Sequence, residues 1–146
     1  MIDLAKALRE VVAQAAARFK QLSDAQASAD RGSGKWVKKE ILGHLIDSAA
    51  NNHQRFVRAQ FANPFVWPGY EQTSWVALHR YRGRSWSELV DLWVALNGHV
   101  AAVIESVPAD KLSTRCMIGE HEPESLEWWM RDYLRHLKHH LAQLAA

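Results

Sequence analysis

Three histidines lie within five residues near the end of the sequence: His136, His139 and His140. In a helix, residues four positions apart stack on one face, so His136 and His140 can bind one metal ion with little adjustment of the backbone. On a helical wheel they lie about 100° and about 60° from the middle of the segment's apolar arc, whereas His139 lies about 160° away. We therefore expect His136 and His140 to face a common site and His139 to point outward.

A third candidate ligand, His44, lies beside the apolar arc of an earlier segment of helical pattern, 36–61. Three neutral imidazoles around a divalent metal leave coordination positions for water or substrate, which is typical of catalytic rather than structural sites. The residues leave an alternative open, in which the histidines are core-edge residues bonded to backbone carbonyls or to neighbours such as Asp132 and Ser48. Spacing alone does not separate the two interpretations.

Polar residues on the same two segments could bind substrate or support the ligands. Arg55 could bind a carboxylate or another anionic group of a substrate, or form a partly buried ion pair with a nearby acid. Ser48 and Asn51 could orient a bound water or ligand, or hydrogen-bond one helix to another. Asp132 or Asp47 could steady an imidazole by accepting its second N–H.

Seven tryptophans in 146 residues indicate a wide pocket or a subunit interface as readily as a dense core. Trp67, Trp75 and Trp129 are candidates for the mouth of a pocket, although packing would explain any one of them. Cys116 lies in a connection without basic neighbours, so we do not expect a reactive thiol. The remaining histidines have no partner at ligand spacing and are left outside the predicted site: His53, His79, His99 and His121.

Four long segments carry apolar residues at helical spacing and must position these side chains. They span 3–22, 36–61, about 85–107 and 125–144. Ser85 and Glu88 fit a capping box, and Ser125 fits an N-cap. In the second segment we expect Lys39 and Asp47 on the exposed side. With no credible strand, the pattern predicts an all-α fold, a four-helix bundle forming a single domain over residues 1–146.

The connections differ in length. Residues 23–35 are rich in Ser, Ala, Asp and Gly and are predicted to be a surface connection. The connection between the second and third helices, 62–84, is long for a bundle and contains the turn formers Pro68 and Gly69. We expect a short helix at 73–81 within it, and we interpret this connection as one wall of the pocket. Residues 108–124 are predicted to be irregular.

The bulk composition excludes several classes of protein. The 18 basic and 16 acidic side chains are scattered, with no basic stripe, so nucleic-acid binding is not expected. No segment approaches the roughly 18 consecutive apolar residues of a membrane span. The single cysteine permits no disulfide within the chain, so we expect a cytoplasmic protein. The tryptophan content and the outward positions of Trp128 and His139 favour a homodimer.

Three stretches of this sequence resemble the DinB-like superfamily, most closely its YfiT branch of metal-dependent hydrolases and bacillithiol transferases. They are the segment from Trp36 to Ser48 with the following Asn51 and Arg55, the loop 68–75, and the His136–His140 signature. The resemblance implies a four-helix bundle, often dimeric, that binds one divalent metal ion, zinc or nickel, through His44, His136 and His140. Relatives include enzymes acting with low-molecular-weight thiols. The sequence departs from the pattern at Val37, where relatives often place a Thr or Ser that caps the second helix.

We derive two functional hypotheses. The first is a metal-dependent enzyme that activates a small thiol or water for attack on a small electrophilic substrate, as a thiol transferase or a hydrolase. The second is a non-catalytic, metal-free bundle that binds a small molecule or a partner. Metal content and the response to added thiols discriminate between them.

Overall fold

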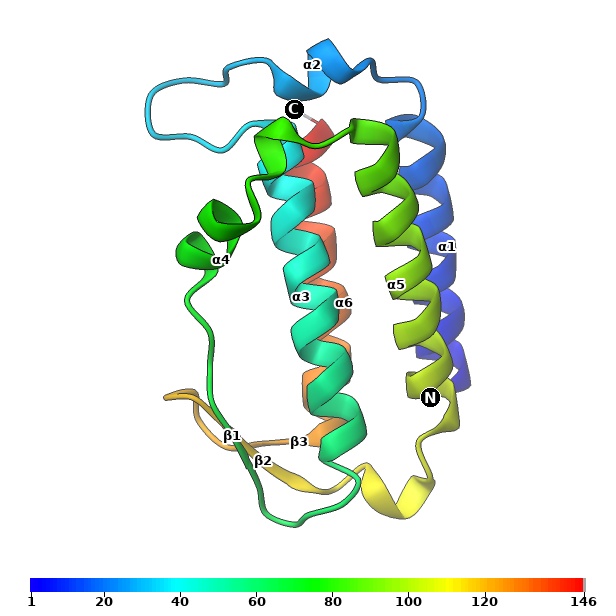
Figure 1. Cartoon of the computed structure of the whole chain (residues 1–146). Coiled ribbons are helices and arrows are strands. Elements are labelled where there is room, and N and C mark those ends of the chain that lie inside the picture. Colours follow the sequence, from blue (N-terminus) through cyan, green and yellow to red (C-terminus); the bar gives the residue numbers. More distant parts are fainter. Residues whose placement is uncertain (146) are drawn as a thin grey trace.

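Four long helices run side by side in the computed structural model, which describes residues 1–145 (Figure 1). They are α1 (Ile2–Phe19), α3 (Lys38–Arg58), α5 (Trp86–Ser106) and α6 (Leu126–Ala145). Helices α3 and α1 each pack against both α5 and α6, so the four helices close a ring around one core. Large side chains such as Trp93, Phe56 and Met130 are fully buried in it. The predicted all-α four-helix bundle is confirmed.

The ends of the helices follow from short-range hydrogen bonds. The Ser85 hydroxyl accepts the N–H of Glu88 at 3.3 Å, and the Ser125 hydroxyl accepts the N–H of Trp128 at 3.1 Å. At Val37, which has no hydroxyl, the Glu40 carboxylate accepts the Val37 N–H at 3.1 Å. The start of α3 therefore keeps half of a capping box despite the missing side-chain acceptor.

Helix α5 is long and apolar enough to cross a membrane by length and composition alone. Its apolar face, which includes Leu89, Trp93, Val100 and Ile104, is buried in the bundle, where α5 packs against α1 and α3. This is the pattern of a core helix in a helical bundle.

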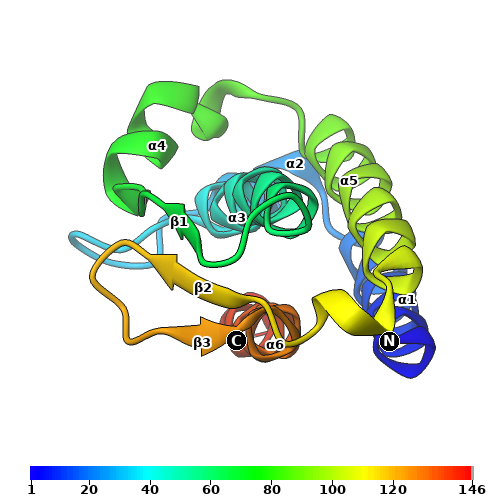
Figure 2. The same ribbon diagram turned by 90° about the horizontal axis from the view of Figure 1, so that it is seen from below.

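Three short strands were not predicted, and the expectation that the chain contains none is wrong. They are β1 (Phe65–Trp67), β2 (Arg115–Ile118) and β3 (Glu124–Ser125), which form one sheet in the order β1-β2-β3. β1 is parallel to β2, and β2 is antiparallel to β3. The sheet joins the connection after α3 to the connection after α5 at one end of the bundle (Figure 2). Strands of two to four residues carry too little periodicity to stand out in a sequence.

The connections contain further helical turns. The predicted surface connection at 23–35 includes α2 (Asp24–Ser28), and the predicted short helix at 73–81 is α4 (Gln72–His79), followed by a 3₁₀ turn η1 (Tyr81–Gly83). A second 3₁₀ turn, η2 (Ala109–Lys111), precedes β2. Helix α4 lies beside α3 on the outside of the bundle (Figure 1).

These connections cover a face of α3 that was expected to be exposed. Lys39 and Asp47 are each only 2% exposed. The Lys39 ammonium lies 2.9 Å from the Asp24 carboxylate of α2, and Asp47 accepts a hydrogen bond from the Tyr81 hydroxyl of η1 at 2.6 Å. The expectation of exposure is wrong because a helical wheel considers one helix and not the segments that fold over it.

Candidate metal centre

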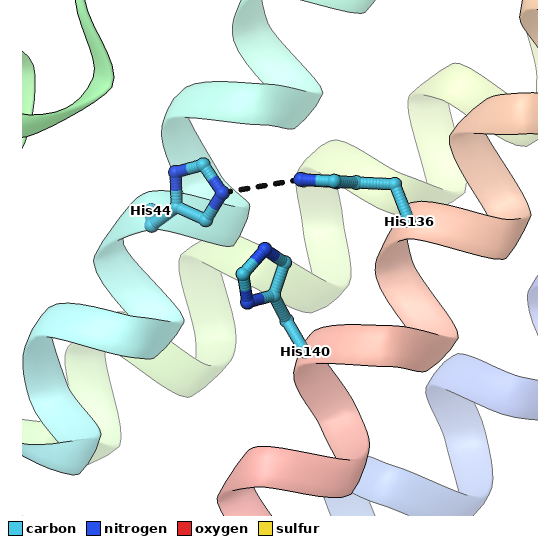
Figure 3. A group of neighbouring side chains, drawn as sticks. All are labelled: His44, His136 and His140. Atoms are coloured by element: carbon cyan, nitrogen blue, oxygen red, sulfur yellow. Dashed lines mark hydrogen bonds between the residues drawn. The ribbon is translucent and has the colours of Figure 1, made fainter.

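Three histidines converge between α3 and α6, and we call His44, His136 and His140 the histidine triad (Figure 3). His44 comes from α3, and the other two come from successive turns of α6. The Nε2 atoms of His44 and His136 are 3.2 Å apart, and one ring nitrogen from each of the three residues lies within 4.8 Å of the others. His44 is fully buried and its two partners are partly buried, whereas His139 is exposed, as predicted.

The donor set of the triad fits a divalent transition metal. Zinc binds imidazole nitrogen at about 2.0–2.1 Å, so two nitrogen ligands on a tetrahedral ion are about 3.3 Å apart. The separation of 3.2 Å between His44 Nε2 and His136 Nε2 is close to that value. Three nitrogen donors from one protein leave at least one coordination position open, which suits a catalytic rather than a structural ion.

Electrostatics keep the triad neutral and its lone pairs available. Burial lowers the pKa of His44 to about 3, and the neighbouring His140 and His136 contribute in the same direction. Burial also lowers the pKa of His136 to about 4, with repulsion from His140 adding to the effect. The pKa of His140 is lowered by burial as well. At neutral pH no proton has to leave the triad before a metal binds.

Neighbouring residues orient two of the rings. His140 Nδ1 lies 2.8 Å from Gln143 Oε1, so an Nδ1–H donated to this acceptor leaves Nε2 free for a metal. The ring of Trp36 lies 5.3 Å from that of His44 and covers it. Asp47, which was considered as a partner for His44, instead accepts from Tyr81 and lies 3.1 Å from His79 Nδ1.

Close packing fixes the backbone next to His44. The ring of Tyr81 lies directly against Gly43, where a Cβ atom would overlap it. Only a glycine permits this approach in the middle of α3. The contact, together with the hydrogen bond from the Tyr81 hydroxyl to Asp47, holds η1 on α3 one turn from the triad.

A cavity of about 310 Å³ lies beside the triad, and His136 is part of its wall. Helices α3 and α6 supply one side, and the connections that carry β1 and β2 supply the other. Of the predicted residues outside the triad, four line this cavity: Ser48, Arg55, Trp129 and Asp132. The expectation that the connection after α3 forms a wall is confirmed by Gly69, Tyr70 and Gln72.

Besides Asp47, three predicted residues lie outside the cavity wall: Asn51, Trp67 and Trp75. The Asn51 amide donates to the backbone carbonyl of Asp47 at 2.9 Å along α3. Trp75 belongs to α4, and its ring lies 5.2 Å from that of Tyr70 and 5.8 Å from that of His79. Asp132 lines the cavity, but its carboxylate accepts from Arg135 at 3.0 Å.

Sequence reasoning did not place six of the cavity residues in the site: Asn52, Ile118, Gly119, Glu120, His121 and Tyr133. Asn52 directly follows Asn51 on α3, and both Asn52 and Tyr133 are buried residues of their helices. Tyr133 lines the cavity, and its hydroxyl donates a hydrogen bond to Asn97 Oδ1 at 2.6 Å. His121 was left outside the predicted site because it has no histidine at ligand spacing, and in the structure its ring lies 5.1 Å from that of Trp128 and 4.8 Å from that of Trp129.

The fold and the triad define a helical bundle with a candidate metal site, and comparison with known proteins places it in a family. The sequence pattern of the DinB superfamily matches residues 7–144, and the chain belongs to this superfamily. Among solved structures it is similar to YfiT from Bacillus subtilis, described as a probable metal-dependent hydrolase with an unusual four-helix bundle topology. The TM-score is 0.79 at 21% sequence identity, covering 97% of this chain and 83% of YfiT. A search of curated proteins finds no match.

Proposed function

We propose that this protein is a metal-dependent enzyme that activates a small thiol or water for attack on a small electrophilic substrate. The observation that carries the proposal is the convergence of three neutral, partly desolvated imidazoles at the wall of a cavity. His44, His136 and His140 would hold one divalent ion, with zinc or nickel suited to nitrogen ligands. Such an ion, when bound, lowers the pKa of water or of a thiol and so yields a nucleophile near neutral pH.

The chain's own residues would hold the reactants next to the triad. His136 belongs both to the triad and to the cavity wall, so a molecule in the cavity lies against one of the metal ligands. Burial raises the pKa of Tyr70 to about 12, so its hydroxyl stays protonated and can donate a hydrogen bond into the cavity. Trp129 and Tyr133 contribute aromatic surface from α6.

Metal analysis tests the triad directly. Protein purified without a nickel column should contain, or take up on titration, one equivalent of a divalent transition metal per chain. His44→Ala should abolish this binding, because it removes the only ligand contributed by α3. His139→Ala is the matched control, since His139 is exposed on α6 and should leave the stoichiometry unchanged. Metal-free wild-type protein that binds no added zinc or nickel would support the metal-free binding bundle instead.

The type of reaction is decided by a screen of electrophiles with and without added thiols. A reaction rate that rises with added bacillithiol, glutathione or a related thiol supports thiol transfer, whereas a rate that does not depend on added thiol supports hydrolysis. His44→Ala should lose either rate. A homodimer and a cytoplasmic location remain predictions, and light scattering of the purified protein tests the first.

A further inference from the structure

Arg55 is a buried cation without an acidic partner. It lies on α3, is 8% exposed and lines the cavity. Among residues 1–145, no carboxylate lies within ion-pair distance of its guanidinium, and its Nε is buried without a hydrogen-bond partner. The guanidinium lies 5.7 Å from the ring of Tyr70 and 5.9 Å from that of Trp129. The two aromatic rings attract the positive charge through their faces, but they do not accept hydrogen bonds from the guanidinium N–H groups, which point outward in the guanidinium plane.

The other buried basic side chain shows the contrast. Lys39, 2% exposed, is paired with Asp24 at 2.9 Å. The two acids that line the cavity do not neutralise Arg55: Asp132 is paired with Arg135 at 3.0 Å, and Glu120 is exposed to solvent. A desolvated charge without a partner is costly, so its retention at the wall of a cavity points to a partner that arrives with the ligand.

We propose that Arg55 forms an anion-binding subsite that accepts a carboxylate of the molecule reacting at the histidine triad. This inference rests on the proposed function and specifies its substrate class. The planar guanidinium fork matches a carboxylate in a two-pronged geometry. The Ser48 hydroxyl, which accepts from Asn52 Nδ2 at 3.3 Å and is hydrogen-bonded to the Tyr70 side chain, adds a polar group to the same cavity.

The separation between the subsite and the triad sets the size of the molecule. Trp129, which flanks Arg55, and His136, which belongs to the triad, are seven residues apart on α6 and lie on the same cavity wall. At 1.5 Å per residue this corresponds to about 10 Å along the helix. The expected ligand is therefore a small carboxylic acid that can place its carboxylate at Arg55 while its reacting atom lies near His136, which lines the same cavity. The carboxylate can belong to the thiol or to the electrophile.

Binding of succinate, with uncharged succinamide as the comparison, tests the subsite. In wild-type protein with selectively labelled arginine side chains, succinate should shift the Arg55 Nε–H signal and succinamide should not. Arg55→Gln should bind succinate about tenfold or more weakly. Arg58→Gln is the matched control, because Arg58 lies one turn further along α3, is exposed and does not line the cavity. An Arg55 signal that saturating succinate does not move would overturn the proposal, whether or not the variant folds.

A second comparison separates this inference from the proposed function. His44→Ala should lose metal but retain succinate binding, so failure of the metal site leaves the Arg55 result readable. Succinate binding that survives in Arg55→Gln but disappears in His44→Ala would place the carboxylate on the metal and overturn the subsite. Mercaptosuccinate and chlorosuccinate then locate the carboxylate. If mercaptosuccinate binds more tightly and its binding depends on Arg55, the carboxylate belongs to the thiol. If chlorosuccinate does so, the carboxylate belongs to the electrophile. Binding of both compounds that does not change in Arg55→Gln rejects the subsite.

Discussion

The metal-free protein should lose stability on acidification because the folded state cannot readily protonate His44. Its pKa falls from an ordinary value of 6.5 to about 3 in the folded chain. The unfolded state therefore binds the proton first, and stability is lost progressively as the pH falls from about 6.5 towards 3. Protonation of His136, whose pKa is lowered to about 4, acts in the same direction.

The magnitude at pH 5 depends mainly on the unfolded state. The ordinary value of 6.5 lies about one and a half pH units above pH 5, and each unit corresponds to about 1.4 kcal/mol. His44 is fully buried, so little solvent screening reduces this value. Moving from pH 7.5 to pH 5 should therefore lower the free energy of unfolding by about 2 kcal/mol through His44 alone.

Urea denaturation followed by circular dichroism, with a chelator present, measures this contribution by comparing wild type with His44→Gln at both pH values. The loss of stability between pH 7.5 and pH 5 should be about 2 kcal/mol smaller in the variant. Other titrating groups, including Asp47, whose pKa is raised by burial, contribute to both proteins and cancel. An equal loss in both proteins would show that His44 is protonated as easily in the folded chain as in the unfolded one.

Gly43→Ala should lower the free energy of unfolding by about 1–3 kcal/mol, because the new methyl group overlaps the Tyr81 ring. Gly98→Ala, at an open and exposed position of α5, should instead raise it by up to about 1 kcal/mol through helix propensity, and urea melts that show the same sign for both would contradict this reasoning. Gln143→Ala should weaken metal binding by about 10–100-fold, since it removes the acceptor for His140 Nδ1–H. Competition with a chromophoric chelator measures that loss, and an unchanged affinity would refute a role for Gln143.

The triad was predictable because its determinants are local. Four-residue spacing places His136 and His140 on one face of α6, and a position beside the apolar arc of α3 turns His44 towards the same interior. The separation of the exposed His139 from the other two follows from the same wheel. The bundle was predictable for the same reason, since helical periodicity extends over about twenty residues in each long helix.

The features that sequence reasoning missed all depend on contacts between distant segments. Lys39 and Asp47 look like solvent-exposed charges until α2 and η1 fold over them. Asn51 and Asn52 are neighbours in sequence, and which of them lines the cavity is decided by the connections that pack opposite α3. The parallel pairing of Phe65 with Cys116 brings together segments on either side of α4 and α5, and no local pattern encodes such pairing.

The small sheet also determines how the cavity can move. β1 and β2 belong to the two connections that wall the cavity, and the Gly119 N–H adds a hydrogen bond of 2.9 Å to the Trp67 carbonyl. Gly119 adopts a left-handed backbone conformation with φ 56, which lets its backbone approach Gly69 of the connection after α3. The two connections cannot separate from each other without breaking these backbone hydrogen bonds. Any movement of this side of the cavity away from α3 and α6 would therefore carry both connections together rather than one at a time.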